Sequence, residues 1–385
     1  MKAGFQYFPE SFMWSQGMMI CIEMARWGGA AMSEVDRVGR RLKGKVGDNE
    51  AWGAEWEKEA QRIEAMGDAA MKDNFVMSAA GHYLRAATYY FVGERFVALG
   101  PKKIGLYRDC LRCFRLAIQH RYPNIERVEV PYTHEGKATT LPAWFMKAPG
   151  EGPKPTVVFF DGLDSTKELS ILFGGVELAL RGINTMAIDG PGQGEALRLQ
   201  EIPSRPDYEV PGAAAYDYVA SRRDVDPKRV AVMAYSMGGY YAPRVAAFEK
   251  RYAACIAWGG HYDYHATWIT RRKIQESGGT QLSAPHYQLP WVMGMPDMDS
   301  AMKKCEQYKL EGVANKITCP FLVTHGEADS ISPVDNAKLL YDAVSSKKKT
   351  LKIFTEEEGG AEHCQGDNRF LGATYVADWI AAHLQ

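Results

Sequence analysis

The chain of 385 residues is 46% hydrophobic and 24% charged, which is the composition of an ordinary globular protein. Its length predicts two domains. The formal net charge of −1 gives no reason to expect nucleic acid or an anionic membrane surface as a partner. Every apolar run falls short of the ~20 residues that a membrane-spanning helix needs, so we expect no membrane attachment.

The first 122 residues are predicted to form a helical domain. Apolar residues recur at helical spacing in four segments, 18–27, 52–71, 76–91 and 102–120. Ser33 precedes an acidic turn and Asn74 precedes the third segment, so both are predicted to cap helix N-termini. The segments have no fixed period, which excludes a solenoid of repeats.

After residue 122 the pattern changes to strands that alternate with helices. Residues 125–147 predict an antiparallel hairpin. Six short strands follow, at 156–160, 184–188, 230–234, 253–258, 320–324 and 350–354, and most are separated by helical segments, near 166–181, 207–222, 334–344 and 369–383. This alternation predicts an α/β fold with a mostly parallel central sheet and helices on both faces. No strand pattern recurs at about 260–318, where we expect a helical, lid-like insertion.

Seven cysteines are scattered through apolar stretches. An odd number without paired spacing favours free thiols in a reducing compartment. The one close pair, Cys110 and Cys113, lacks the second pair that a zinc site would need. Glu23 and Arg26 interrupt the apolar character of residues 12–22, which argues against a secretory signal. We therefore expect a cytoplasmic protein without a metal or other cofactor.

Ser236 lies where an apolar strand gives way to a helix, with the small residues Ala234 and Gly238 two positions to either side. A serine in this setting is typical of a nucleophile elbow, a tight turn that exposes the hydroxyl at the end of the sheet. The alternative is an ordinary turn of small residues. The loops that follow other strands decide against that alternative.

Those loops carry polar groups at the edge where open α/β sheets bind ligands. After the first parallel strand, Gly162 lets backbone N–H groups turn toward an anion. We predict that the Leu163 N–H, together with that of Met237, forms an oxyanion hole. Asp329 and His363 follow the last two strands, and the order serine, acid, histidine predicts a catalytic triad.

Further polar residues are candidates for substrate contact. Glu168 begins the first core helix, where it either stabilises the helix start or faces the site. His261 and Asp263 are predicted to contact substrate, as is Gly162. With His265 they would share one face of an extended segment, so a metal site is an alternative. Asp263 is also an alternative acid for the triad.

Several motifs resemble those of the α/β-hydrolase superfamily: Asp161-Gly162, Asp189-x-Pro-Gly-x-Gly194, Tyr235-Ser-Met-Gly-Gly239, His325-Gly-x-x-Asp329 and Glu362-His363. The string Asp161-Gly-Leu-Asp-Ser-Thr-Lys-Glu168, with a helical N-terminal domain, is more specific. It resembles the family of carbon–carbon bond hydrolases that contains 2,6-dihydroxypseudooxynicotine hydrolase and polyketide-shortening enzymes.

The resemblance implies an α/β-hydrolase core at 123–385 and a helical domain at 1–122 that covers the active site and forms a homodimer. It implies Ser236, Asp329 and His363 as the triad, and an additional acid for which Asp263 and Glu168 are candidates. The expected reaction is cleavage of a carbon–carbon bond next to a ketone in a small aromatic or polyketide substrate. Hydrolysis of an ester, lactone or amide is the alternative, and a non-catalytic binding protein on the same fold is a remote one.

Overall fold

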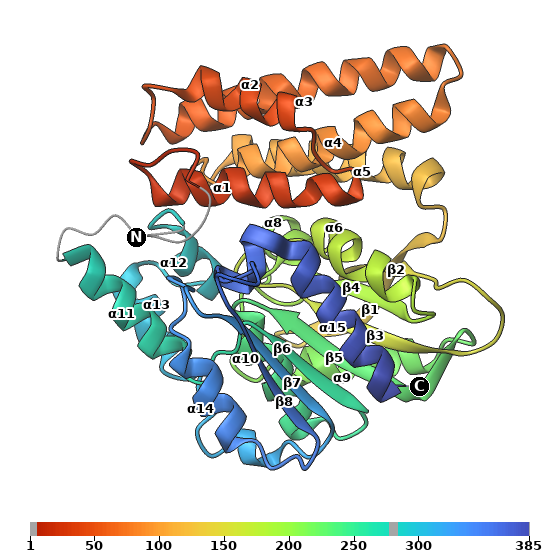
Figure 1. Ribbon diagram of the computed structural model, residues 1–385, viewed down its shortest axis with the longest axis vertical. Coiled ribbons are helices and arrows are strands. Elements are labelled where there is room, and N and C mark those ends of the chain that lie inside the picture. The colour runs from red at the N-terminus through yellow and green to blue at the C-terminus, as the bar shows by residue number, and fades with distance from the viewer. Residues whose placement is uncertain (1–5, 277–283, 385) are drawn as a thin grey trace. The chain divides into compact units, whose positions relative to one another are not determined.

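The computed structural model describes residues 6–276 and 284–384 (Figure 1). These residues group into two compact units. The helical unit contains residues 6–125, 274–276 and 284–287, and the sheet unit contains residues 126–273 and 288–384. Within the described residues, every helix is too short or too polar to span a bilayer.

The helical unit is built from long helices packed along one another. They are α1 (Phe12–Glu23), α2 (Met32–Leu42), α3 (Asn49–Lys72), α4 (Val76–Glu94) and α5 (Pro101–Arg121). Trp14, Trp52, Trp56 and Phe96 form the centre of its core, with neighbouring ring centroids 4.9–5.7 Å apart. Burial of several large aromatic rings stabilises this unit chiefly through the hydrophobic effect.

The predicted caps at Ser33 and Asn74 were wrong. Ala31 occupies the N-cap of α2, and its N–H donates to the Tyr89 hydroxyl at 3.0 Å, so a tertiary contact sets where this helix begins. Asn74 adopts a left-handed conformation, with φ of 61°, after the end of α3, and Phe75 is the N-cap of α4. Asparagine tolerates this conformation better than most residues, so here it serves the turn.

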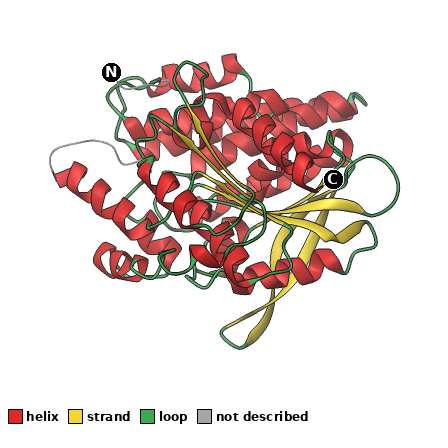
Figure 2. Cartoon of the chain, turned by 60° about the horizontal axis from the view of Figure 1, so that its bottom comes forward, coloured by secondary structure: helices red, strands yellow, loops and turns green. Residues whose placement is uncertain are grey.

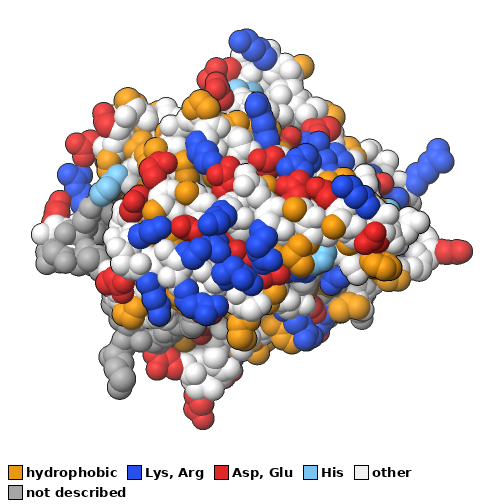
Figure 3. All heavy atoms as spheres, turned by 90° about the horizontal axis from the view of Figure 1, so that it is seen from above, with side chains coloured by type: hydrophobic (Ala, Val, Ile, Leu, Met, Phe, Trp, Pro, Cys, Tyr) orange, Lys and Arg blue, Asp and Glu red, His pale blue; other side chains and the backbone are white. Residues whose placement is uncertain are grey.

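The outer face of α2 and α3 is strongly charged, with basic and acidic side chains intermixed (Figure 3). Arg41 pairs with Glu55 at 2.7 Å and with Glu59 at 3.1 Å, and Lys45 pairs with Glu55 at 3.1 Å. These pairs balance the charges locally, which agrees with the near-neutral charge of the whole chain.

The sheet unit contains eight strands in the order β1-β2-β4-β3-β5-β6-β7-β8. Their bounds are β1 Ile125–His134, β2 Lys137–Met146, β3 Lys154–Phe160, β4 Asn184–Ile188, β5 Val225–Tyr235, β6 Ala254–Trp258, β7 Phe321–Gly326 and β8 Lys349–Phe354. Strand β2 pairs antiparallel with β4, and the pairs from β4 through β8 are parallel. The predicted mostly parallel sheet is confirmed.

Helices surround the strands of this unit (Figure 2). They are α6 (Lys167–Ser170), α7 (Val176–Ala179), α8 (Gly194–Gln200), α9 (Glu209–Ala220), α10 (Gly238–Phe248), α11 (Tyr264–Glu276), α12 (Gln288–Met293), α13 (Met298–Cys305), α14 (Asp335–Ala343) and α15 (Arg369–Leu384). The sequence did not predict α8, because glycines and a proline precede it. Its first turn is held by Asp189, whose carboxylate accepts the Glu195 N–H at 2.7 Å.

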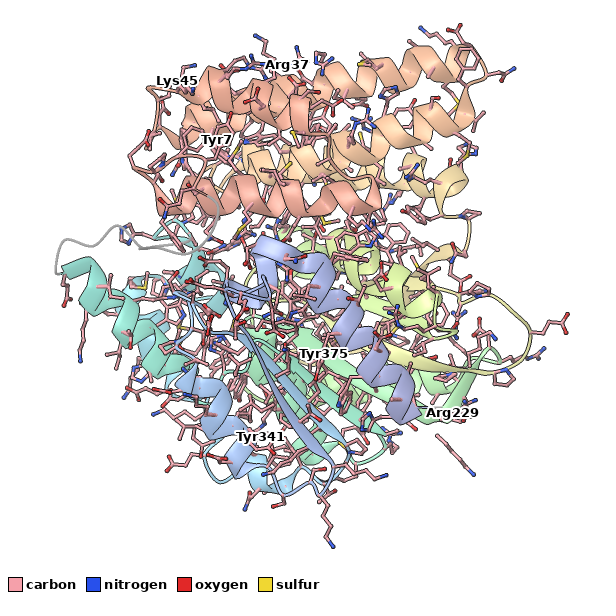
Figure 4. All side chains as sticks on the ribbon, in the orientation of Figure 1. Tyr7, Arg37, Lys45, Arg229, Tyr341 and Tyr375 are labelled. Carbon is pink, nitrogen blue, oxygen red and sulfur yellow. The ribbon has the colours of Figure 1, made fainter. Side chains whose placement is uncertain are left out.

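The edge strand β8 is protected by lysines and by flanking aromatic residues. The Lys349 ammonium lies over the ring of Tyr341 on α14, 4.6 Å from its centroid. On the other side, Tyr375 on α15 meets the Phe354 ring at 5.6 Å (Figure 4). Lysine on an edge strand disfavours pairing with a strand of another chain.

Candidate active site

Ser236 occupies a strained turn between β5 and α10. Its φ of +59° lies in the left-handed region, which non-glycine residues adopt only rarely. The turn leaves no space for larger neighbours. A Cβ atom at Gly238 would lie 2.5 Å from the Ala234 Cβ, and one at Gly239 would lie 1.9 Å from the Gly259 carbonyl oxygen. The small residues seen in the sequence are therefore required by the elbow.

Hydrogen bonds connect Ser236, His363 and Asp329, which come from loops after three different strands. His363 Nε2 lies 2.8 Å from Ser236 Oγ, and His363 Nδ1 lies 2.7 Å from Asp329 Oδ2. A carboxylate only accepts, so Nδ1 carries the proton and Nε2 is left to accept from the serine hydroxyl. This arrangement can remove a proton from Ser236 as it attacks an electrophile.

The Asp329 carboxylate is buried and held in a fixed orientation. Its Oδ1 accepts the N–H groups of Ile331 and Ser332, both at 2.8 Å. His325 supports the same loop, because its Nε2 donates to the Ser332 carbonyl at 2.8 Å. Burial opposes ionisation, but the neighbouring His363 and these hydrogen bonds hold the pKa of Asp329 well below its usual range.

The electrostatics of His363 are dominated by this carboxylate. Burial alone would lower the pKa of His363, but Asp329 outweighs burial and raises it above the ordinary 6.5. Cys364 adds a contact that sequence reasoning missed. Its Sγ lies 3.6 Å from His363 Nε2 and donates to the Trp258 carbonyl at 3.3 Å. Its φ of 50° turns the chain sharply after the histidine, a conformation that no local pattern signals.

The Gly162 loop lies against the nucleophile. A Cβ atom at Gly162 would be 2.8 Å from the Ser236 Cβ, so only glycine permits this approach. Among the described residues, no acceptor receives the backbone N–H of Leu163 or that of Met237. Two unpaired N–H groups beside a serine hydroxyl can bind an oxygen that becomes negatively charged during a reaction.

Comparison with known proteins shows the family to which the chain belongs. Residues 179–385, more than half of the chain, match the model of the prolyl oligopeptidase family. The chain belongs to the prolyl oligopeptidase family. This member is similar to the hydrolase acrC of Aspergillus aculeatus, with 30% identity over 92% of each chain. It is also similar to 2,6-dihydropseudooxynicotine hydrolase of Paenarthrobacter nicotinovorans, with 28% identity over 93% of this chain and 91% of that one.

The crystal structure of 2,6-dihydroxy-pseudo-oxynicotine hydrolase has the same fold, with a TM-score of 0.77 and 23% identity over 94% of this chain and 95% of that one. The resemblance inferred from the sequence motifs is thus confirmed. The protein is a hydrolase of the α/β-hydrolase type.

In this member of the prolyl oligopeptidase family, Glu168 lies in a buried cluster of charges. Its Oε1 accepts the Trp144 indole N–H at 2.7 Å and lies 2.9 Å from the Lys167 ammonium. The same ammonium lies 2.7 Å from Asp189 and 3.0 Å from Glu195. The cluster is adjacent in sequence to the Gly162 loop and fixes the start of α6.

His261 and Asp263 lie on either side of one turn. His261 is buried, and its Nδ1 lies 3.2 Å from the Ser332 hydroxyl, beside the loop of Asp329. Burial lowers the pKa of His261 well below its usual value, which favours the neutral ring. Asp263 accepts the Ala266 N–H at 2.9 Å, at the start of α11, and pairs with Lys309 at 3.3 Å. The residues that the structure describes contain no group of three side chains arranged to bind a metal.

Proposed function

We propose that this hydrolase uses Ser236, His363 and Asp329 as a catalytic triad to cleave a carbon–carbon bond next to a ketone. The substrate class that we propose is a small aromatic compound or polyketide. The observation that supports the triad is the hydrogen-bond chain from Asp329 through His363 to Ser236.

In the proposed reaction, Ser236 Oγ attacks the ketone carbon while His363 Nε2 takes the serine proton. The carbonyl oxygen becomes negatively charged and is bound by the N–H groups of Leu163 and Met237. The carbon–carbon bond then breaks, and the carbanion leaves with a proton from His363. Water, activated by the same histidine, hydrolyses the acyl-serine and regenerates the enzyme.

Support for carbon–carbon cleavage comes from the relatives. The full-length similarity to a protein named 2,6-dihydropseudooxynicotine hydrolase, together with the Asp161–Glu168 string, favours this reaction over general ester hydrolysis. Such cleavage requires a leaving carbanion that an adjacent ring or carbonyl stabilises. An ester needs no such stabilisation, so the two reactions can be separated by substrate.

The test is product analysis by mass spectrometry. Wild-type protein and Ser236→Ala are incubated with aryl 1,3-diketones and, separately, with aryl esters. Loss of the nucleophile is expected to reduce turnover of the diketones by about 10⁴-fold or more. Ser345→Ala, which changes an exposed serine, serves as the matched control and is expected to retain wild-type turnover.

Each outcome has a defined meaning. Diketone cleavage that Ser236→Ala abolishes supports the proposal. Turnover of esters alone would retain the triad and replace the proposed reaction with ester hydrolysis. Diketone cleavage by Ser236→Ala within tenfold of wild type would contradict the triad assignment.

A further inference from the structure

Helix α11 carries a buried arginine with almost no acceptors. Arg271 is only 9% exposed. Among the described residues, its guanidinium finds one hydrogen-bond acceptor, the Ile331 carbonyl at 3.2 Å from Nε, and no carboxylate within ion-pair distance. A guanidinium has five N–H donors and stays charged in proteins, so most of this donor capacity is unused.

A second buried donor lies beside it. Trp268 is 5% exposed, and its indole N–H has no hydrogen-bond partner among the described residues; the adjacent Tyr264 hydroxyl does not meet it with hydrogen-bond geometry. The Arg271 guanidinium carbon lies 4.7 Å from the centroid of the Trp268 ring. Buried polar groups in proteins are nearly always paired, so the unpaired Trp268 N–H, beside a guanidinium with spare donors, indicates a missing acceptor. We call Trp268 and Arg271 the α11 donor pair.

Hydrogen bonds and ring contacts connect this pair to the proposed triad. Ile331, which accepts from Arg271, lies two residues after Asp329 and donates its own N–H to the Asp329 carboxylate. One helical turn before Arg271, Thr267 Oγ1 lies 3.4 Å from His261 Nδ1. The ring of His261 meets Tyr264 at 5.2 Å, and the His261 N–H donates to the Gly239 carbonyl at 3.4 Å. The face of α11 that carries the donor pair therefore borders the Asp329 loop and, through His261, the elbow.

The charge balance favours an anionic occupant. Desolvation lowers the pKa of Arg271, and the described residues supply no carboxylate in contact to compensate. Tyr264 and Asp329 offset the desolvation only in part, and a ligand carboxylate in contact with the guanidinium would compensate its charge further. The planar fork of a guanidinium matches the two oxygens of a carboxylate, and an indole N–H can donate to a further lone pair.

We propose that Arg271 and Trp268 form a binding site for a carboxylate group of the substrate, remote from the bond that is cleaved. This inference rests on the proposed function in that it places the substrate beside Ser236. It deepens that function by assigning a substrate class, aromatic or polyketide acids, and by naming Arg271 as the residue that selects for the acid.

The test measures binding in Ser236→Ala, so that no turnover is needed. Isothermal titration calorimetry compares 4-phenylbutanoate with its neutral analogue 4-phenylbutanamide. With Arg271 present, the acid is expected to bind about tenfold or more tightly than the amide, as for a charge-assisted hydrogen-bonded pair. Arg271→Met should abolish this preference, and Arg271→Lys should retain part of it because the charge remains.

The neighbouring arginine provides the matched control. Arg272 is half exposed and pairs with Asp299 at 2.8 Å, so Arg272→Met should leave the acid preference unchanged. Equal binding of the two probes, or a preference that survives Arg271→Met, would overturn the assignment. An equal loss of both probes in Arg271→Met and Arg271→Lys would also overturn it, because a merely structural role of Arg271 affects both alike.

Labelling with a fluorophosphonate separates this inference from the proposed function. Absence of a Ser236 adduct in the wild-type protein would contradict the triad and leave the calorimetric preference as an independent result. An adduct without any acid preference would contradict only the carboxylate site.

Discussion

The residues around Ser236 differ in how their charge is controlled. Asp329 is buried but receives hydrogen bonds from Ile331, Ser332 and His363. His363 is kept near this anion, whereas His261 lies buried without a carboxylate in hydrogen-bond contact among the described residues. The two imidazoles therefore differ in the direction of their pKa shift: the pKa of His363 is raised and that of His261 is lowered. The difference is caused by the partner rather than by the degree of burial.

This difference predicts the pH dependence of activity. A general base acts in its neutral form, so kcat/KM should rise with pH through the pKa of His363. Because Asp329 raises that pKa, the midpoint of the rise should lie above 6.5. In Asp329→Asn the burial of the ring is no longer opposed, so the midpoint should move to lower pH while the maximal rate falls.

The measurement is kcat/KM against pH for both proteins, with whichever substrate class the product analysis identifies. A midpoint in Asp329→Asn equal to or above that of the wild type would contradict the assigned origin of the shift. Both proteins retain His325, which holds the Asp329 loop through the Ser332 carbonyl. The two pH profiles therefore differ only by the charge of the residue at position 329.

At the scale of elements, the loops after the strands are held by buried interactions beneath them. The Lys167 ammonium has no solvent exposure and contacts Asp189, Glu168 and Glu195. Burial opposes its charge, but these carboxylates raise the pKa of Lys167 above its usual value. The backbone N–H of Lys167 also donates to Asp189, at 2.8 Å, so one carboxylate joins the loop after β4 to the start of α6.

Removal of this cation should be strongly destabilising. Lys167→Met leaves Asp189 and Glu168 buried without their counter-charge, and we expect the free energy of unfolding to fall by about 3–5 kcal/mol. The measurement is urea denaturation followed by circular dichroism. As a matched control, Lys338→Met removes an exposed lysine that pairs with Asp335 at 3.4 Å, and a change within about 0.5 kcal/mol is expected. Similar effects of the two substitutions would contradict a structural role for the Lys167 cluster.

At the scale of the whole molecule, we predict a homodimer. The prediction rests on the resemblance stated above and on apolar side chains that the helical unit exposes in the last turns of α3 and at the start of α4. Phe75 is 63% exposed, Met77 58% and Met66 41%. Exposed apolar groups that gather in one region favour an interaction surface.

Light scattering at micromolar concentration should therefore give twice the mass of one chain. The double variant Phe75→Glu and Met77→Glu tests the surface, because charges placed in an apolar contact disfavour association. A monomer in the wild type would contradict the dimer, and a dimer that persists in the variant would place the interface elsewhere.

The sequence by itself determined the class of fold and the places where polar residues follow strands. Apolar runs of five or six residues and amphipathic helices are local patterns, and local patterns survive without knowledge of distant contacts. The elbow was predictable for the same reason: Ala234, Ser236 and Gly238 are close in sequence, and the tight turn depends on their own sizes. The cap at Ser33 failed because a distant hydroxyl, that of Tyr89, meets the chain at Ala31 instead.

Only the tertiary structure decided which side chains meet. Asp263 and Asp329 were both candidates to contact His363, and the chain brings Asp329 to the histidine while Asp263 caps α11. The contacts of Lys167, the turn at Cys364 and the unpaired donors of Trp268 and Arg271 have no signature in the sequence. Lys167 meets Asp189, Cys364 meets the Trp258 carbonyl and Arg271 meets the Ile331 carbonyl, and these distant contacts are set by the packing of strands and helices rather than by any local preference.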